Sequence, residues 1–290
     1  LPRRNARFRM SEISFREATL DDLDDLAAIY IDAVDTIGPR AYSPAQIAAW
    51  RRWPIDSPEE VKQRVFAGTC RVAEYNGTPV AFAAFTPPDH LDFLYTKGQF
   101  SGRGLATQLH QQLEDIARKQ DAVILRTEAS YLSRPVFNRL EYEVVEFEDV
   151  VRFEETFRRF NMRKILRAGP PATGPENRCI HPHTPSFEKS PRVAAEERVS
   201  FQRHDNDNPG WFKGIDPRGI SGYFPTAWFE IDASTHNAIA QRDYDAAELS
   251  VQIQDPIYEL ESIGPWSRVL DQSGKYGWIR RKCWEDGSAS

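Results

Sequence analysis

Two glycines and an arginine, Gly102, Arg103 and Gly104, stand between an apolar run and a helical pattern. The apolar run is Leu91 to Tyr95, and aliphatic residues at helical spacing follow at positions 105, 109, 113 and 116. The first amides of a helix have no partner within it, and the helix dipole adds positive charge there. Glycine lets the backbone approach a ligand, and arginine adds a cation. The stretch therefore predicts a phosphate-binding turn, although an ordinary strand-to-helix connection has the same pattern.

The composition is typical of a globular protein of two or three domains. The chain has 290 residues with 40% hydrophobic and 12% aromatic residues. A net charge of −6 argues against nucleic acid or a membrane as the main partner. Three dispersed cysteines give no disulfide framework, and no apolar run reaches the ~20 residues of a membrane span, so we expect a cytoplasmic protein. Residues 1–11 predict a disordered extension, because they are basic and lack the apolar stretch of a signal peptide.

The first part of the chain predicts strands followed by a helix that crosses to another strand. Alternation at 13–16 indicates a first strand, and Ser43-Pro44 is typical of a helix start. Further elements are expected as strands at 70–75, 79–85, 90–96, 123–127, 143–147 and 158–166, and as helices at 59–66, 103–119 and 131–140. This order predicts an α+β sheet around one core.

The spacing Gln99-x-x-Gly102-x-Gly104, followed by Leu105-Ala106, resembles the acetyl-coenzyme A signature of the GNAT superfamily of N-acetyltransferases. The runs 90–104, 127–130 and 160–166 resemble one bacterial subgroup, the YafP-like acetyltransferases. The resemblance covers residues 12–167 and implies the GNAT fold, a mixed sheet flanked by helices. It also implies direct transfer of an acetyl group from acetyl-coenzyme A (acetyl-CoA) to an unidentified primary amine, without a metal.

The same resemblance implies the acetyl-CoA site. The amides of Leu94 and Tyr95, on the fourth strand, would bind the pantetheine arm and polarise the acetyl carbonyl. The pyrophosphate would lie on the amides of the glycine turn, in register with Gln99: Gly102, Arg103, Gly104, Leu105 and Ala106. The subgroup usually has proline where this chain has Gly98, so we expect a looser exit from the strand.

An amine must be neutral to attack a thioester, so the site needs a base. Asp92 lies among apolar residues, where a carboxylate is costly unless it is paired or used. A base and a structural hydrogen bond fit Asp92 equally well. Glu128, at the end of the fifth strand, is the second candidate, and His90 is expected to be exposed at the start of its strand.

In many GNAT enzymes a tyrosine on the last short helix helps the thiolate to leave. The corresponding residue here is Phe137, so no general acid is evident in that place. Tyr131, Tyr142 or water could supply the proton, or the enzyme works without an acid. This departure from the family pattern argues against a fully competent catalyst.

The acceptor site is expected between the first two helices and the sheet. Tyr30, Trp50 and Trp53 lie there in the sequence and could stack on a substrate. Core packing for Trp50, and a helix end before Pro54 for Trp53, are the simpler roles. The identity of the substrate does not follow from these residues.

Residues 168–184 predict a linker, rich in proline and glycine at its start. The two blocks after it share tryptophan and glycine landmarks at a period near 50 residues, and each resembles an SH3 domain. We therefore expect two small all-β SH3-like barrels, at 185–233 and 236–286. Cys179, His181 and His183 are too crowded for a closed metal site and have no evident fourth ligand, so no metal is expected.

SH3 domains usually grip proline-rich peptides in an aromatic groove. Trp211, Pro225 and Trp228 could line one in the first block, whereas packing is the expected role of the second. The alternative function for the whole chain is a non-catalytic adaptor that binds coenzyme A and a peptide partner. The sequence leaves a homodimer open.

Overall fold

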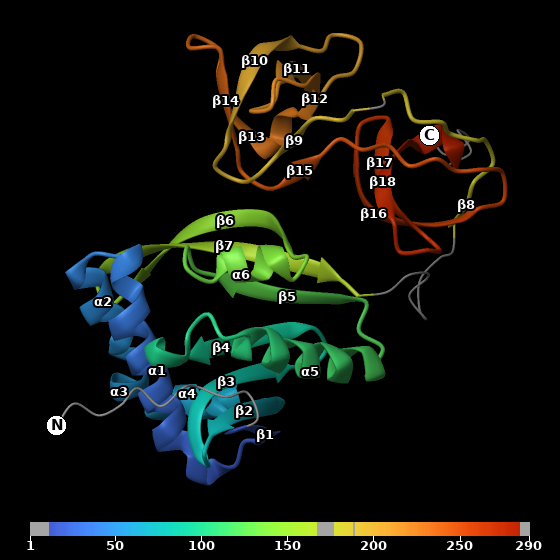
Figure 1. Cartoon of the computed structure of the whole chain (residues 1–290). Coiled ribbons are helices and arrows are strands. Elements are labelled where there is room, and N and C mark those ends of the chain that lie inside the picture. The colour runs from blue at the N-terminus through green and yellow to red at the C-terminus, as the bar shows by residue number, and fades with distance from the viewer. Residues whose placement is uncertain (1–11, 167–176, 188, 285–290) are drawn as a thin grey trace. The chain divides into compact units, whose positions relative to one another are not determined.

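The computed structural model describes residues 12–166, 177–187 and 189–284, which divide into two units (Figure 1). The first unit holds the chain up to Tyr142 and Glu148–Lys164, and the second holds Glu143–Phe147 and the chain from Ile165 on. The predicted extension at 1–11 and residues 168–176 of the predicted linker lie outside the described residues. No helix in the described part of the chain is long and apolar enough to cross a membrane.

One seven-stranded sheet organises the first unit, in the order β1-β2-β3-β4-β5-β7-β6. Its strands are β1 (Ile13–Glu17), β2 (Thr69–Tyr75), β3 (Thr78–Thr86), β4 (His90–Thr96), β5 (Ile124–Ala129), β6 (Glu143–Arg152) and β7 (Glu155–Ile165). The first four strands pair antiparallel, whereas β4 and β5 are parallel. This mixed sheet confirms the predicted α+β class for the N-terminal part.

Six α-helices accompany the sheet: α1 (Leu23–Ile37), α2 (Pro44–Arg51), α3 (Trp53–Asp56), α4 (Pro58–Val65), α5 (Leu105–Lys119) and α6 (Arg134–Arg139). Short 3-10 turns are η2 (Leu20–Asp22), η3 (Gly38–Arg40) and η4 (Gly98–Phe100). Helix α2 begins after Ser43, as predicted. Ser43 forms a capping box with Gln46, and Pro44 is the first residue of the helix. Buried residues of α5 recur at helical spacing from Leu105 to Ala117, which gives the helix one apolar face.

Strand β3 lies at the centre of this core. Residues 80–85 are all buried, and successive side chains of a strand point to opposite faces, so both faces of β3 are covered. Phe82 and Ala84 pack with Ile29 and Val34 of α1, and α5 contacts β2, β3 and β4. These contacts fix β4, which carries most of the predicted site.

Strands β4 and β5 pair only at their start. The described residues contain one register pair, His90 with Arg126, and Thr127 Oγ1 donates to the Leu91 carbonyl at 2.9 Å. Beyond Leu91, β4 remains paired with β3 as far as Thr96. The backbone edge of β4 from Asp92 to Thr96 is therefore open on the side of β5.

Gly98 anchors the exit from β4 instead of loosening it. Its N–H donates to Asp32 Oδ1 of α1 at 2.6 Å, a bond that proline could not make. A Cβ at Gly98 would also collide with the side chain of Thr36. The expected looser exit is therefore not found.

Replacing Gly98 by proline should lower the free energy of unfolding by at least about 2 kcal/mol, because the Asp32 carboxylate loses its donor. Chemical denaturation would measure this. Asp32→Asn retains an oxygen acceptor and should cost less than Asp32→Ala. Equal costs for the two Asp32 variants would show that the bond contributes little.

The second unit contains short antiparallel strands. A five-stranded sheet in the order β12-β11-β10-β14-β13 consists of β10 (Arg198–His204), β11 (Trp211–Ile215), β12 (Ser221–Pro225), β13 (Phe229–Asp232) and β14 (Asn237–Ala240). A four-stranded sheet in the order β18-β17-β16-β8 consists of β8 (Asn177–Arg178), β16 (Pro256–Ile263), β17 (Trp266–Asp271) and β18 (Tyr276–Arg280). A separate pair joins β9 (Arg192–Val193) to β15 (Tyr244–Asp245).

The predicted internal repeat corresponds to two similar series of elements. Three consecutive strands end in a 3-10 turn in each, at η5 (Thr226–Trp228) after β12 and at η6 (Arg281–Cys283) after β18. Neither sheet closes within the described residues, so the predicted barrels are corrected to open sheets. The predicted boundaries also shift, because β14 from the second block pairs with β10 and β13, and β8 from the linker pairs with β16.

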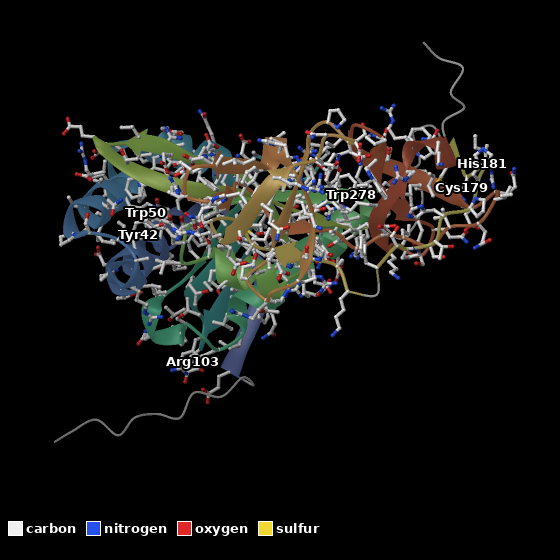
Figure 2. The ribbon with its side chains drawn as sticks, turned by 90° about the horizontal axis from the view of Figure 1, so that it is seen from above. Tyr42, Trp50, Arg103, Cys179, His181 and Trp278 are labelled. Carbon is white, nitrogen blue, oxygen red and sulfur yellow. The ribbon has the colours of Figure 1, made fainter. Side chains whose placement is uncertain are left out.

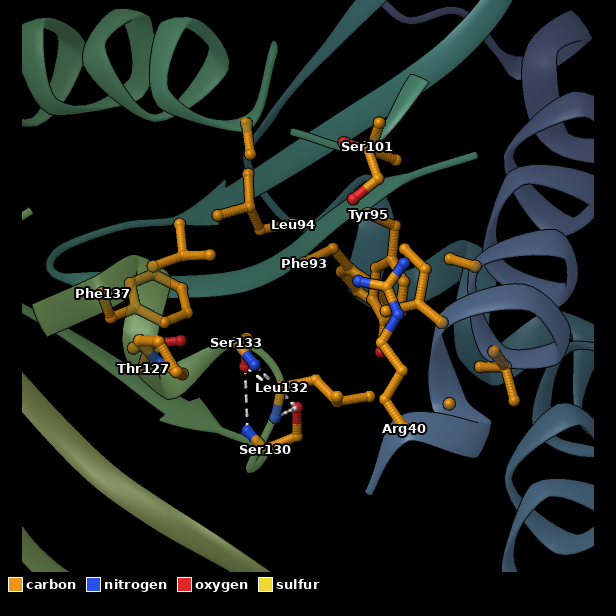
Figure 3. A pocket seen from close by; sticks show the side chains of 18 of the residues that line it. Arg40, Phe93, Leu94, Tyr95, Ser101, Thr127, Ser130, Leu132, Ser133 and Phe137 are labelled. Carbon is orange, nitrogen blue, oxygen red and sulfur yellow. Dashed lines mark hydrogen bonds between the residues drawn. The ribbon is translucent and has the colours of Figure 1, made fainter. Parts of the chain in front are cut away.

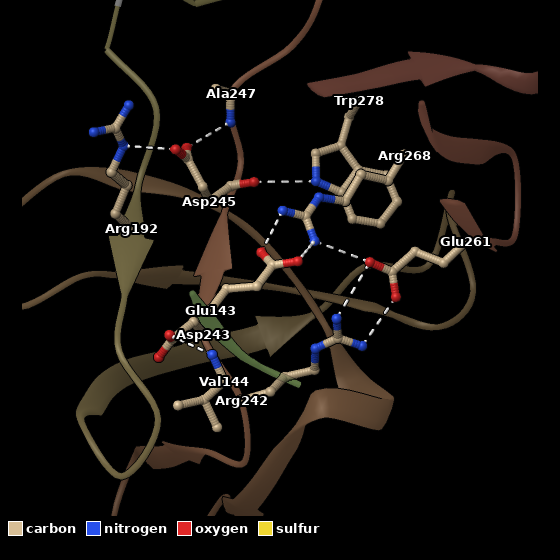
Figure 4. A network of polar contacts seen from close by, with 10 residues as sticks. All are labelled: Glu143, Val144, Arg192, Arg242, Asp243, Asp245, Ala247, Glu261, Arg268 and Trp278. Carbon is tan, nitrogen blue, oxygen red and sulfur yellow. Dashed lines mark hydrogen bonds and ion pairs between the residues drawn. The ribbon is translucent and has the colours of Figure 1, made fainter. Parts of the chain in front are cut away.

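Side chains from the second series complete the core of the first. Trp278 of β18 belongs to the same buried cluster as Phe212, and its Nε1 donates to the Asp245 carbonyl at 3.1 Å (Figure 4). The same figure shows Arg268, which is 3% exposed and pairs with Glu143 and Glu261 at 2.6 and 3.0 Å. Trp278 of the second series therefore lies in the core of the first, while the second series also has a separate buried cluster that includes Ile257 and Val269.

Candidate active site

Two cavities meet in the first unit. One has a volume of about 380 Å³ and borders the glycine turn before α5, so we name it the turn-side cavity. The other has a volume of about 400 Å³ and borders residues 150–153 and 157–159 of β6 and β7, so we name it the hairpin-side cavity. They share five lining residues, two of them carboxylates: Trp50, Asp92, Tyr95, Glu128 and Ser130.

The glycine turn provides an unobstructed helix start. Gly102 and Gly104 have φ of +75° and +81°, a region that favours glycine. A Cβ at Gly102 would meet nothing within 4 Å, and no side chain caps the first amides of α5. An anion can therefore approach these amides from the turn-side cavity.

The predicted cofactor residues divide into two groups. Those that line the turn-side cavity are Leu94, Tyr95, Gly102 and Ala106. Figure 3 shows the first two. The other four, Gln99, Arg103, Gly104 and Leu105, flank the cavity without lining it. Gln99 is exposed and Leu105 is buried. The Arg103 guanidinium lies over the Phe100 ring, 5.6 Å from its centroid. The roles of this second group in binding stay predictions.

The pairing of β4 decides which of its amides are free. Lys97 N donates to the Val80 carbonyl at 2.9 Å, and the register continues with Tyr95 opposite Phe82. Hydrogen-bonded positions alternate in an antiparallel ladder, so the Tyr95 N–H faces β3, and those of Leu94 and Thr96 face the open edge. The predicted Leu94 amide therefore faces the open edge and the predicted Tyr95 amide does not, and the role of Leu94 stays a prediction.

The turn-side cavity is also bordered by two arginines that were not predicted from the sequence. Arg40 of η3 extends into the cavity toward Tyr95 (Figure 3). Arg139 lies in the last turn of α6. Both side chains are exposed. Neither belongs to a motif, and only the fold brings them to the cavity, so no local pattern could have identified them.

The two predicted carboxylates have different partners. Asp92 accepts from Arg64 Nη2 at 2.7 Å and from Thr86 Oγ1 at 2.6 Å, and its side chain is 9% exposed. Glu128 is 33% exposed and lies 3.1 Å from His90 Nε2. Asp92 thus has a structural role that Glu128 lacks.

His90 is half-buried, whereas an exposed residue was expected. Its hydrogen bond to Glu128 raises the pKa of the imidazole above its usual value of 6.5, and the same bond lowers the pKa of the Glu128 carboxyl. The hydrogen bond therefore stabilises the imidazolium–carboxylate form of the pair. A carboxylate held in this way can accept a proton once its histidine partner is neutral.

Tyr142 does not reach either cavity. It is 4% exposed, its hydroxyl lies 3.0 Å from His110 Nε2, and its ring packs against Phe137. Phe137 lines the turn-side cavity and separates Tyr142 from it. The prediction of Tyr142 as a proton donor is corrected for this reason, and Tyr131 lines neither cavity.

The partner of Tyr142 leads to a prediction about stability. Burial lowers the pKa of His110 to about 4, from 6.5 in an unfolded chain. The unfolded chain therefore binds the additional proton, and the free energy of unfolding should fall as the pH drops from 6.5 to 4, by about 1.4 kcal/mol for each unit of pKa difference. Denaturation at several pH values should show a smaller fall in His110→Gln. The matched control His204→Gln, at an exposed histidine, should behave like the wild type.

The predicted acceptor residues Tyr30 and Trp50 both line the hairpin-side cavity. The Tyr30 hydroxyl donates to the Trp50 carbonyl at 3.4 Å, and Trp53 also lines the wall. Tyr42 lies beside Trp50, with ring centroids 5.1 Å apart (Figure 2). These aromatics pack on the core through one side and border the cavity with the other.

The predicted peptide-binding residues of the second unit face its interior. Trp211 is 5% exposed and packs against Trp278, and Pro225 is buried. Trp228 carries the Arg242 guanidinium over its ring at 3.9 Å. Trp211 borders a cavity of about 230 Å³ in the second unit, whereas Pro225 and Trp228 do not line it.

The Cys179–His183 stretch has structural partners. Cys179 is buried, and His183 Nε2 lies 2.8 Å from Glu248. No group of three or more potential metal ligands occurs within residues 12–166, 177–187 and 189–284.

Comparison with known proteins identifies the kind of enzyme. Residues 34–142 match the model of the Acetyltransferase (GNAT) family. The uncharacterized N-acetyltransferase YafP of Escherichia coli (strain K12) is 29% identical over 154 residues, which cover 53% of this chain and 97% of that protein.

Two solved structures show different degrees of similarity. A GCN5-related N-acetyltransferase from Rhodopseudomonas palustris is 28% identical, with a TM-score of 0.52, over 56% of this chain and 100% of that chain. The PaiA N-acetyltransferase of Thermoplasma acidophilum, in complex with coenzyme A, is 17% identical, with a TM-score of 0.41, over 53% of this chain and 98% of that chain. The first unit is therefore similar in sequence to acetyltransferases of the GNAT family, and similar in fold to one of them.

Proposed function

We propose that the first unit transfers the acetyl group of acetyl-CoA directly to a primary amine that enters through the hairpin-side cavity. The observation that carries this proposal is the junction of the two cavities at Asp92 and Glu128. A donor in one cavity and an acceptor in the other would meet beside a base.

The residues of the turn-side cavity would bind the donor. The amides of α5 and its glycine turn would hold the pyrophosphate, and the open edge of β4 would receive the thioester. The Leu94 N–H would donate to the carbonyl oxygen, where negative charge develops during attack. Acetyl-CoA supplies the activated acyl carbon.

Glu128 with His90 is the base that we propose. The pair would take a proton from the acceptor ammonium, and the neutral nitrogen would then form its bond to the acyl carbon as the carbon–sulfur bond breaks. Glu128 is more exposed than Asp92, whose oxygens already accept from Arg64 and Thr86. The leaving thiolate would take its proton from water, since Phe137 has none to give.

Ligand binding and turnover together test the proposal. Acetyl-CoA at about 100 times its dissociation constant should raise the free energy of unfolding by about 2.7 kcal/mol. Release of free thiol in the presence of a panel of primary amines would then report transfer. The proposal fails if acetyl-CoA neither stabilises the protein nor loses its acetyl group to any amine.

The alternative is a non-catalytic adaptor that binds coenzyme A and a peptide. Its basis is Phe137 together with Trp211, Pro225 and Trp228, which the predicted SH3-like groove requires. Because those three residues pack within the second unit, the acetyltransferase has the better support. The relationship of the second unit to SH3 domains stays a prediction, based on its repeated three strands and 3-10 turn.

A further inference from the structure

We propose that the acceptor is a monoamine with an aromatic body, an inference that rests on the proposed function. The hairpin-side cavity has the volume of a small-molecule site, about 400 Å³. Seven of its lining side chains are aromatic and three are aliphatic. The walls and the charges of this cavity each restrict the acceptor.

One wall consists of Tyr42, Trp50 and Phe157. Their ring centroids lie 5.1 to 6.0 Å apart, and the Trp50 ring meets both others edge to face. Trp50 and Phe157 stay partly exposed, although both rings pack against neighbours. An aromatic body could extend this cluster by one more ring, which an alkyl chain would do less well.

A second aromatic group comes from other elements. Tyr30 of α1 lies 4.6 Å from Tyr95 of β4 and 6.0 Å from Trp53 of α3, measured between ring centroids. Tyr95 also borders the turn-side cavity, so this group reaches the junction where the acetyl group would arrive. An aromatic acceptor would therefore contact rings along its path to the base.

The charges of the cavity favour a single ammonium group. Asp92 is paired with Arg64, which stays charged at every working pH, so it offers no net negative charge. Glu128 is paired with His90, which can lose its proton. Of the four arginines that line the cavity, Arg64, Arg158 and Arg159 are paired with carboxylates. The remaining charges on the wall, Arg152 and Glu60, are both exposed.

A polycation such as a polyamine would need several carboxylates without cationic partners. Glu128 is the carboxylate beside both cavities whose partner can lose its charge, and the exposed Glu60 is the wall carboxylate that forms no ion pair within the described residues. This lining favours one amine on a ring-bearing body over polyamines and aminoglycosides.

Steady-state kinetics of the full chain with defined amines test this inference. We expect kcat/KM for 2-phenylethylamine, tyramine or tryptamine to exceed that for n-hexylamine by about 2- to 12-fold, the range of one aromatic contact. Spermidine should be the poorest substrate. A higher kcat/KM for spermidine or n-hexylamine than for all three aromatic amines overturns the inference but leaves the proposed function standing. Absence of acetyl-CoA binding and of turnover with every amine overturns both.

A variant of the aromatic wall provides the second test. Phe157→Leu should lower kcat/KM for the aromatic amines by about 2- to 12-fold and change that for n-hexylamine less. The matched control is Phe187→Leu in the second unit, where the ring is 54% exposed. An equal loss with both classes of amine would mean that Phe157 acts only on the fold. The thermal shift with acetyl-CoA shows whether the variant is folded.

A charge reversal on the cavity wall tests whether the charges of the cavity favour a monoamine over a polyamine. Arg152 is exposed on the wall of the cavity, and Arg152→Glu should raise kcat/KM for spermidine several-fold at low salt while that for 2-phenylethylamine changes little. No gain for spermidine would contradict the electrostatic part of the inference.

Discussion

Gly102→Glu should weaken acetyl-CoA binding by at least about 100-fold, because a like charge placed against the phosphates costs several kcal/mol. The glutamate side chain would project from the backbone that faces the turn-side cavity. A Cβ at this position meets nothing within 4 Å, so the effect would come from charge and occupied space, not from a collision with the protein. Isothermal calorimetry with acetyl-CoA would measure the loss.

Gly77→Glu is the matched control. Gly77 has a φ of +77° and, like Gly102, open space around its missing Cβ, but it lies in the turn between β2 and β3 and lines neither cavity. Both substitutions therefore impose the same kind of backbone strain. If both weaken acetyl-CoA binding equally, the glycine turn is not the phosphate site.

Glu128→Gln should lower kcat by about 10²- to 10⁴-fold, the usual contribution of a positioned base, with little change in the dissociation constant of acetyl-CoA. Glutamine keeps the size of the side chain and a hydrogen bond to His90 but takes up no proton. Pre-steady-state acetyl transfer and calorimetry would separate the two quantities. An unchanged kcat would exclude Glu128 as the base.

The pH dependence gives an independent check on this pair. Below the raised pKa of His90 the imidazolium holds the carboxylate, and above it the pair can accept a proton. The profile of kcat/KM should therefore rise with pH through a midpoint above 6.5, and this limb should be absent in His90→Gln. Asp92→Asn is the comparison, because Asp92 also helps to raise the pKa of His90: the rising limb should remain but its midpoint should move to lower pH.

Local patterns were sufficient for the glycine turn and for the elements around it. Strand, glycines and helix are contiguous in the sequence, so the pattern contains everything that forms the turn. The mixed sheet followed from the order of elements for the same reason. The start of α2 was predicted from the adjacent residues Ser43 and Pro44, and the structure adds a capping bond between Ser43 and Gln46.

Contacts between distant segments could not be obtained in this way. The pairing of His90 with Glu128 depends on the register of β4 beside β5, which the sequence does not state. Tyr142 was one of the candidate acids. Its buried contact with His110 could not be foreseen, because His110 lies on another element. The ladder between β3 and β4 determines which amides are free. It turns the Tyr95 N–H toward β3 and the Thr96 N–H toward the open edge.

Contacts between distant segments were equally hard to foresee in the second unit. Repeated landmarks revealed two similar series of strands, but they suggested two separate barrels. Strand β14 instead completes the sheet of β10, and Trp278 enters the core that Phe212 occupies. A repeat in sequence is therefore not a boundary in the fold.

The open edge of β4 and the acceptor cavity differ in how easily amino-acid substitutions can change them. The N–H groups along this edge belong to the main chain, so nineteen of the twenty amino acids at position 94 would retain the donor, and only proline would remove it. The acceptor cavity, in contrast, is built from side chains of several helices and strands. Single codon changes there can select a new amine while the place of the acetyl group stays the same, so the reaction can persist through changes of substrate.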